Sequence, residues 1–466
     1  MADDFLSHPP HPSSMSKTNY HRQTLSSRTT ASLLGLALGD AIGLYTEFLS
    51  ASESRAAYPQ KRFILWSCPP GPPTPFHMDS HRAQNEEGDW TDDTDHCLLV
   101  LLAFLHTARM REGGEGVEAV VPIFDGEERG SFAVKVGKLP LPSATDLAER
   151  LSIWVRCGLR ALDTLPLGLG ALVGNVVRSP DFLGDPMKVA RSYWTTHTAP
   201  NGDKLAPNGS LMRTAPVGLI CLWKTEEECF RLAAELGKVT HADPRCVVAC
   251  VVGSALVRGL VRGEVESGGD VTDLIRRGVE WYKNEGSKMD GAVRDTLDEQ
   301  EVWRFVGHET TLADLKLDEE GKIGYVYKTL GAGVVLLRKA FGERMKSDGP
   351  RQKQERFERL ITQLVMEGGD ADTNACFAGA LLGATMGQEA LPDHWRNGLN
   401  HGKWLSGKAT ALCRVLGLED GKYNGKEDLD THPDGGRGIL SREEMDKRWR
   451  DFDKRTRQKM DAKRKR

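Results

Sequence analysis

The sequence lacks the features that identify disulfide-rich, zinc-binding, membrane-spanning or secreted proteins directly. Its nine cysteines are scattered over 466 residues without a Cys-X-X-Cys pair, so neither a disulfide framework nor a zinc site of the usual spacing is indicated. No apolar run approaches the roughly 18–20 residues that cross a bilayer, and no apolar segment follows the acidic N-terminus as in a signal peptide. We therefore expect reduced thiols, no membrane partner and a cytoplasmic or nuclear location.

A large excess of charge of one sign is also missing. The chain has 62 Lys and Arg against 66 Asp and Glu, a formal net charge of −4, which excludes a basic nucleic-acid coat. Aromatic residues make up 7% and do not alternate with basic residues as in a platform for stacked bases. Residues 441–466 are an exception, with 12 basic and 6 acidic side chains. We interpret them as a solvated charged helix, with nuclear localisation or RNA contact as the alternative.

Alternating strand patterns are scarce, whereas helical patterns run almost throughout. From residue 31 to about residue 416 apolar residues recur at intervals of three and four, as in ASLLGLALGDAIGLYTEF and NACFAGALLGATMG. We predict an all-α fold, a compact orthogonal bundle of many helices with small irregular insertions. The predicted divisions are a disordered segment at 1–29, one domain at 30–417 and a charged, basic tail at 418–466.

Two insertions interrupt the predicted domain. Residues 67–89 contain several prolines, which forbid a helix there, and a loop of this length is either functional or a plain surface insertion. Residues 111–140 contain the segments VVPIF and SFAVKV, whose composition predicts a small β-hairpin.

Glycines recur at helical spacing in two segments. They lie four residues apart at Gly35, Gly39 and Gly43, and again at 379, 383 and 387, so each series lies along one face of a helix. A glycine inside a helix costs about 1 kcal/mol relative to alanine. We infer that the two helices lie deep in the domain, where their backbones approach closely.

Three acidic clusters lie at the ends of predicted helices. Asp40 and Glu47 belong to the first glycine-rich helix, TDDTD at 91–95 precedes an apolar helix, and GGDADTN at 368–374 precedes the second glycine-rich helix. Thr and Asp are favoured N-cap residues, and acids in a first turn complement the helix dipole, so capping is one interpretation. A cap needs one side chain, however, and two of these clusters hold two or three acids before helices that must be buried.

The clusters would share a pocket if these helices pack together. Their carboxylates would then repel one another, and several would have to take up protons. Divalent cations would offset the charge, and carboxylate and Thr oxygens suit Mg²⁺, Mn²⁺ or Ca²⁺ better than Zn²⁺. Five carboxylates suffice for a centre of two metal ions: Glu47, Asp92, Asp93, Asp370 and Asp372.

Several motifs, taken in order, resemble those of the ADP-ribosylglycohydrolases. They are GLALGDAIGLYTEF, GDWTDDTD, APNGSLMRTAPVGL, VTHADP and GGDADTNACFAGALLGA, and they span about residues 31–415. The resemblance implies a compact all-α domain with a binuclear centre of two Mg²⁺ ions, with Mn²⁺ as the other candidate. For Asp40 it implies a supporting role rather than direct ligation. The metal ligands that it implies are Glu47, Thr91, Asp92, Asp93, Asp370, Asp372 and Thr373.

The resemblance also assigns two loops and a histidine to substrate binding. The implied residues are Gly168, Gly170, Asn208, Gly209, Ser210 and His241. A turn that opens into a helix, as at 207–213, can bind phosphate through its N–H groups. An ordinary capped loop has the same pattern, a lone Gly-X-Gly is a weak signal, and a structural role for the histidine is equally open.

The implied function is hydrolysis of the glycosidic bond between ADP-ribose C1″ and an acceptor, which is an ADP-ribosylated protein side chain or a small conjugate. Glu47 is expected nearest the reacting carbon, Asp93 is the second catalytic candidate, and a metal-activated water is the nucleophile. Two alternatives stay open: a module that binds ADP-ribose without cleaving it, and a two-metal phosphohydrolase acting on nucleotide-like substrates. We expect a monomer.

Overall fold

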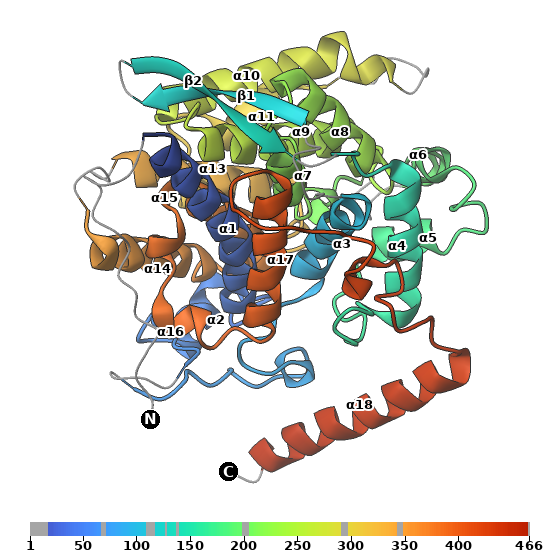
Figure 1. The fold of residues 1–466 in the computed structure, drawn as a ribbon. Coiled ribbons are helices and arrows are strands. Elements are labelled where there is room, and N and C mark those ends of the chain that lie inside the picture. The colour runs from blue at the N-terminus through green and yellow to red at the C-terminus, as the bar shows by residue number, and fades with distance from the viewer. Residues whose placement is uncertain are drawn as a thin grey trace, which may run out of the picture.

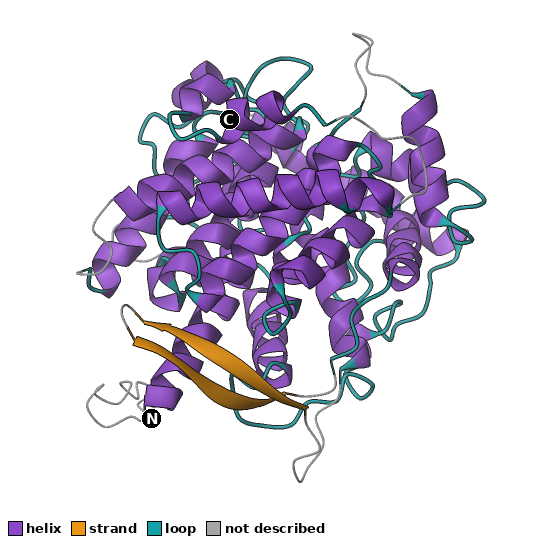
Figure 2. Ribbon diagram, turned by 90° about the horizontal axis from the view of Figure 1, so that it is seen from above, coloured by secondary structure: helices purple, strands orange, loops and turns teal. Residues whose placement is uncertain are grey.

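A computed structural model describes residues 17–66, 71–108, 117–125, 128–136, 139–197, 205–289, 297–342 and 348–464. Within these ranges the chain is helical apart from one hairpin and the connecting loops (Figure 1; Figure 2). The prediction of an all-α fold with small insertions is confirmed.

The α-helices are α1 Lys17–Gly43, α2 Ala51–Ala57, α3 Asp92–Thr107, α4 Ala144–Cys157, α5 Ala171–Val177, α6 Pro186–Thr196, α7 Ala215–Ile220, α8 Glu226–Lys238, α9 Pro244–Arg262, α10 Gly268–Asn284, α11 Glu299–Val306, α12 Leu312–Leu315, α13 Val326–Gly342, α14 Pro350–Val365, α15 Ala371–Met386, α16 Asp393–Arg396, α17 Gly402–Val415 and α18 Arg442–Arg464. Short 3₁₀ helices are η2 Arg82–Gln84, η3 Asn208–Ser210, η4 Gly286–Lys288, η6 Gln388–Ala390 and η7 Leu429–Thr431.

Helix α1 packs against α15 on one side and α17 on another (Figure 1). A Cβ atom added at Gly35 would lie 2.4 Å from the carbonyl oxygen of Gly379, and one at Gly39 would lie 2.0 Å from that of Ala375. Neither position has room for a side chain, so the predicted close backbone approach is confirmed, and the structure adds that the two glycine-rich helices are each other's partners. Gly387 differs from the prediction, because it lies past the end of α15 as its C-cap, with φ 76°.

Helix α9 is a strongly apolar core helix. It begins with Pro244 after an Asp243 cap and ends at Gly263 in the left-handed region, which are favoured start and stop residues. Its 19 residues include a window with a mean hydropathy of 1.6, apolar enough to cross a membrane, so the sequence does hold a longer apolar helix than we expected. In the structure 94% of that window is buried, against α7, α8, α10 and α13.

The predicted hairpin is also confirmed. Strands β1 (Val117–Asp125) and β2 (Glu128–Val136) pair antiparallel, with Val121 opposite Phe132. Figure 2 shows the hairpin at the edge of the helical body.

Both predicted boundaries of the domain need correction. Helix α1 begins at Lys17, so residues 17–29 are helical rather than disordered. At the other end, residues 418–441 pack on the domain, where Lys408 of α17 binds the carboxylate of Asp428 at 2.6 Å. The solvated charged segment begins only at α18, whose side chains are mostly exposed.

Candidate functional site

The acidic clusters come together because three helix ends meet. Helix α1 ends at Gly43, where an added Cβ would lie 2.3 Å from the Cα of Asp372 in the first turn of α15. Helix α3 begins at Asp92, and the N-cap before it hydrogen-bonds Asp40 of α1. The close approach of α1 and α15 therefore joins segments that are far apart in the sequence.

Asp40 fastens α1 to the start of α3. Its Oδ1 accepts hydrogen bonds from the N–H and hydroxyl of Thr91 at 3.0 and 2.9 Å, and its Oδ2 accepts those of Thr94 at 3.0 and 2.6 Å. Two of these donors are N–H groups that lack partners within α3, so Asp40 caps that helix from outside. Four hydrogen bonds leave the carboxylate little capacity for a cation, which favours the supporting role expected of it.

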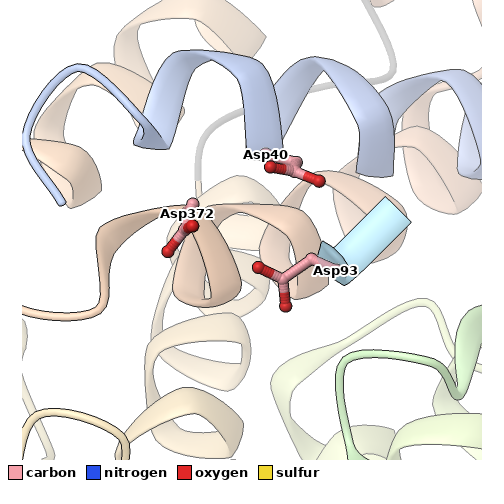
Figure 3. A group of neighbouring side chains, drawn as sticks. All are labelled: Asp40, Asp93 and Asp372. Carbon is pink, nitrogen blue, oxygen red and sulfur yellow. The ribbon is translucent and has the colours of Figure 1, made fainter. Parts of the chain in front are cut away.

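Two overlapping groups of carboxylates lie close enough together to hold cations. Oxygens of Asp40, Asp93 and Asp372 lie within 4.8 Å of one another, and so do those of Glu47, Asp370 and Asp372. Figure 3 shows the first group, whose side chains come from α1, α3 and α15 and converge on one place. Asp372 belongs to both groups, so it lies where one carboxylate can serve two cations.

Burial and mutual repulsion raise the pKa values of these carboxyls. Burial is the main cause of the high pKa of Asp93 and of Asp372, with the nearby charge of Asp40 acting on the first and that of Glu47 on the second. Burial raises the pKa of Asp40 to about 7, although its hydrogen bonds from threonines oppose the rise. The pKa values of two more carboxyls are raised by burial and then by the charge of Glu47: Asp92 and Asp370.

The donor set fits a hard divalent cation. Oδ1 of Asp93 is buried and has no hydrogen-bond partner among the described residues, whereas Oδ2 accepts from the hydroxyl of Thr373 at 3.1 Å. A buried acceptor without a partner is costly, and a bound cation would supply that partner. Ligands that are all oxygen suit Mg²⁺ or Mn²⁺.

The two threonines predicted as ligands lie differently. Thr373 lines the cavity beside the carboxylates. Thr91 is the N-cap of α3, accepts from the N–H of Asp93 at 3.4 Å, and is not among the residues that line the cavity. Its role as a ligand stays a prediction. The Thr91 hydroxyl donates a hydrogen bond to Asp40.

Glu47 comes from a turn that follows α1, whereas the sequence led us to expect it on the first glycine-rich helix itself. Residues 44–48 follow α1, and the N–H of Glu47 donates to the carbonyl of Gly43 at 3.0 Å. Phe48 has φ 61°, a left-handed conformation that costs about 1–2 kcal/mol, and its N–H donates to the carbonyl of Gly369 at 2.7 Å. The turn brings the carboxylate of Glu47 beside the start of α15.

The carboxylates open into a cavity of about 760 Å³, within the usual range of roughly 300–1,000 Å³ for ligand pockets. The predicted glycine loop lines this cavity through Gly168 and Gly170. Gly168 has φ 78°, and an added Cβ would lie 2.2 Å from Oδ1 of Asp92. Only a glycine lets the loop approach the carboxylates so closely, which explains the residue type at this position.

The second predicted loop contacts the carboxylate cluster as well as the cavity. Asn208 lines the cavity, and its Nδ2 donates to Oδ2 of Asp370 and to the hydroxyl of Thr329, both at 2.9 Å. Sequence reasoning did not foresee this bond. Gly209 also lines the cavity, whereas Ser210 is 1% exposed and does not. The predicted contact of Ser210 with substrate stays a prediction that its position does not favour.

His241 lines the cavity next to this loop. Its Nδ1 lies 2.7 Å from the hydroxyl of Thr240, and its Nε2 has no partner among the described residues. Burial, with the charge of nearby Arg213, lowers the pKa of His241 well below its ordinary value, so the ring is neutral. Arg213 donates to the Thr240 hydroxyl at 2.8 Å, and that hydroxyl can in turn donate to Nδ1 and leave the proton on Nε2.

A further wall of the cavity was not predicted. Arg245 lies over the ring of Tyr325 at 5.7 Å, and the Tyr325 hydroxyl donates to Glu301 at 2.7 Å. All three line the cavity. They come from separate helices and loops without a common motif, so only the folded chain brings them together.

The fold and the site define a class: an all-helical domain with a buried carboxylate centre suited to divalent cations, beside a cavity for an organic ligand. Comparison with known proteins makes the class specific, because the family profile described as ADP-ribosylglycohydrolase matches residues 21–423. The chain belongs to the ADP-ribosylglycohydrolase family.

Individual relatives are distant. The chain is 22% identical over 400 residues to the ADP-ribosyl-[dinitrogen reductase] glycohydrolase of Rhodospirillum rubrum, a match that covers 84% of this chain and 97% of that protein. It is 21% identical over 393 residues to the ADP-ribosylarginine hydrolase Tri1 of Serratia proteamaculans (strain 568), covering 84% and 81%. A solved structure described as an ADP-ribosylglycohydrolase-related protein complex matches at 22% identity and a TM-score of 0.49, covering 84% and 99%.

Proposed function

We propose that this protein is a metal-dependent hydrolase that cleaves the glycosidic bond between ADP-ribose C1″ and an acceptor, with two Mg²⁺ or Mn²⁺ ions in the carboxylate centre. The observation that carries the proposal is the pair of carboxylate groups that share Asp372 and open into the cavity. Membership of the family supports the class of reaction. The proposed substrate is an ADP-ribosylated protein side chain or a small ADP-ribose conjugate.

The acidic residues have different roles in this proposal. Asp93, Asp370 and Asp372 hold the cations, since an oxygen of Asp372 lies within 4.8 Å of one of Asp93 in the first group and of one of Asp370 in the second. The ions, when bound, lower the pKa of a water and offset the charge that develops as the bond breaks. Glu47 reaches the cavity from its turn, lies nearest the reacting carbon and acts there as the base or as a movable ligand of a cation. Asp93 is the second candidate for that role.

The loops bind the rest of the substrate in this proposal. Gly168, Gly170 and Gly209 line the cavity without side chains, so their backbone N–H groups can approach a pyrophosphate closely. His241 offers a neutral ring nitrogen beside them. Arginine-linked ADP-ribose is the first linkage to test, because one relative is named an ADP-ribosylarginine hydrolase.

The test is release of free ADP-ribose from arginine-linked and serine-linked ADP-ribosyl peptides, followed by mass spectrometry in Mg²⁺, in Mn²⁺ and in EDTA. The proposal expects release that depends on the metal and is lost in Asp372→Asn. Tight binding of ADP-ribose without release would identify a binding module instead. Release of AMP or inorganic phosphate would identify a phosphohydrolase.

A further inference from the structure

Glu47 is held in a different way from the other carboxylates of the centre. Asp93 accepts a hydrogen bond from Thr373 in the first turn of α15, and Asp370 accepts one from Asn208 in η3. Within the described part of the chain, the side chain that hydrogen-bonds the Glu47 carboxylate is that of His81, whose Nε2 lies 2.6 Å from Oε2. His81 belongs to residues 71–89, the described part of the proline-rich loop, and lies outside every motif noted in the sequence.

The residue after His81 binds the backbone of the same turn. Arg82 is fully buried, and its Nε donates to the carbonyl of Tyr45 at 2.8 Å. Its Nη2 donates to the carbonyl of Glu47, and its Nη1 pairs with Asp79 of its own segment. Two consecutive residues of the loop therefore hold the backbone and the side chain of the turn that carries Glu47.

His81 itself is not a core residue. A quarter of its side chain (26%) is exposed, and its ring packs edge-on against Phe48 with centroids 4.8 Å apart. Its loss would remove a partly exposed ring beside Phe48 and would leave no hole in the hydrophobic core. A role in the geometry of the site therefore explains its contacts better than a role in stability.

We propose that His81 is a positioning residue of the metal centre, which holds one oxygen of Glu47 so that the carboxylate faces Asp370 and Asp372. The proposal rests on the proposed metal centre, and it goes beyond it by giving the proline-rich loop a function. The contact does not withdraw Glu47, because its carboxylate lies within 4.8 Å of the oxygens of Asp370 and Asp372 while bonded to His81. A flexible glutamate left unheld would lose more conformational entropy on binding a cation.

The first test is Mn²⁺ binding to the metal-free, full-length protein by isothermal titration calorimetry. Partners of this kind typically change metal affinity or activity by about 10–100-fold, so His81→Ala should weaken Mn²⁺ binding at least tenfold. His81→Gln should restore it to within about threefold, because the Gln amide can donate from a similar position. The control is His77→Ala, on the same loop with an exposed side chain, which should bind like the wild type.

A double-mutant cycle tests whether His81 acts through Glu47. In a Glu47→Ala background, His81→Ala should change Mn²⁺ affinity less than twofold, because the group that it positions is gone. Turnover of an ADP-ribosyl peptide should show the same pattern, with kcat of His81→Ala lowered at least tenfold and KM changed less than threefold.

Two results would overturn the inference: wild-type Mn²⁺ affinity in His81→Ala, or an equal loss on changing His81 with and without Glu47. The test is separate from that of the proposed function. A wild-type protein that releases no ADP-ribose, but loses Mn²⁺ affinity in His81→Ala, would contradict the function and support the positioning role.

Discussion

The centre is assembled from two kinds of structure, the packed start of α15 and the turn after α1. Asp372 stands in the first turn of a helix whose backbone touches that of α1, so it moves only if the core moves. Glu47 stands on a strained turn and is held by side chains of a loop. The comparison indicates that Asp372, proposed to hold cations, is fixed by backbone packing, whereas Glu47, proposed nearest the reacting carbon, is held by side-chain contacts that can change.

Substitutions of Asp372 and of Glu47 should affect metal binding and turnover to different extents. Asp372→Asn removes charge from both groups, so Mn²⁺ affinity should fall more than about 100-fold, beyond the usual loss for a supporting residue. Glu47→Gln should lower turnover by roughly 10²–10⁴-fold, as for loss of a general base, with Mn²⁺ affinity reduced less than in Asp372→Asn. Calorimetry and product release measure both effects, with exposed Asp181→Asn as the control. Equal losses of Mn²⁺ affinity in the two variants would contradict the proposed difference between Asp372 and Glu47.

A substitution at the contact of α1 with α15 should destabilise the packed helices that carry Asp372. An added Cβ at Gly383 would lie 2.1 Å from the carbonyl oxygen of Ala31, so Gly383→Ala should lower the free energy of unfolding by about 1–3 kcal/mol or more. Gly407 of α17 has no atom within 4 Å of an added Cβ, and Gly407→Ala should raise it by about 1 kcal/mol. Urea denaturation compares the two, and a stable Gly383→Ala variant would show that the close contact is dispensable.

The stability of the metal-free protein should depend on pH through the buried carboxyls. The pKa of Asp40 is about 7 in the folded protein and about 3.9 in an unfolded chain, so the folded state binds more protons between these values. Stability should therefore fall as pH rises from about 4 to 7, by about 1.4 kcal/mol per unit for each such proton. Melting temperatures in EDTA should show this slope, and Mg²⁺ should flatten it. The same slope in both conditions would count against cation binding at the cluster.

The smallest effect is expected where α18 touches the loop that carries His81. Lys459 donates to the carbonyl of Asn85 at 3.0 Å and pairs with Glu86 at 2.5 Å, next to η2. Exposed ion pairs contribute about 0–1 kcal/mol, so Lys459→Ala should lower kcat less than threefold and speed amide hydrogen exchange in residues 71–89. Lys454→Ala, on the exposed face of the same helix, is the control. Unchanged exchange would mean that α18 does not steady the loop.

The features predicted from sequence are those that leave a local pattern. Apolar spacing predicts the helices, and glycines at intervals of four predict that α1 and α15 lie deep in the domain with closely approaching backbones. Acids before buried helices predict the carboxylates that converge, since a cap needs only one of them. These features can be predicted because each depends on residues within a few positions of one another in the sequence.

The features that were missed depend on contacts across long stretches of chain. His81 reaches Glu47 through an irregular loop, and Asn208 reaches Asp370 across 162 positions, without periodicity to indicate either contact. The boundaries failed for a related reason. Residues 17–29 are polar, so composition suggested disorder, and residues 418–441 are charged, so composition suggested part of a charged tail, but contacts such as that of Lys408 with Asp428 hold the second segment on the domain.

The pairing of α1 with α15 also limits how early in its synthesis the chain can fold. Helix α1 cannot cover its glycine face until residues 371–386 have been made. At a synthesis rate of about 5–20 residues per second, that face waits for tens of seconds. Contacts between such distant segments also slow folding itself. The nascent chain therefore carries α1 with an uncovered face while the intervening residues are made, and Asp40, Asp93 and Asp372 cannot converge before α15 has been synthesised.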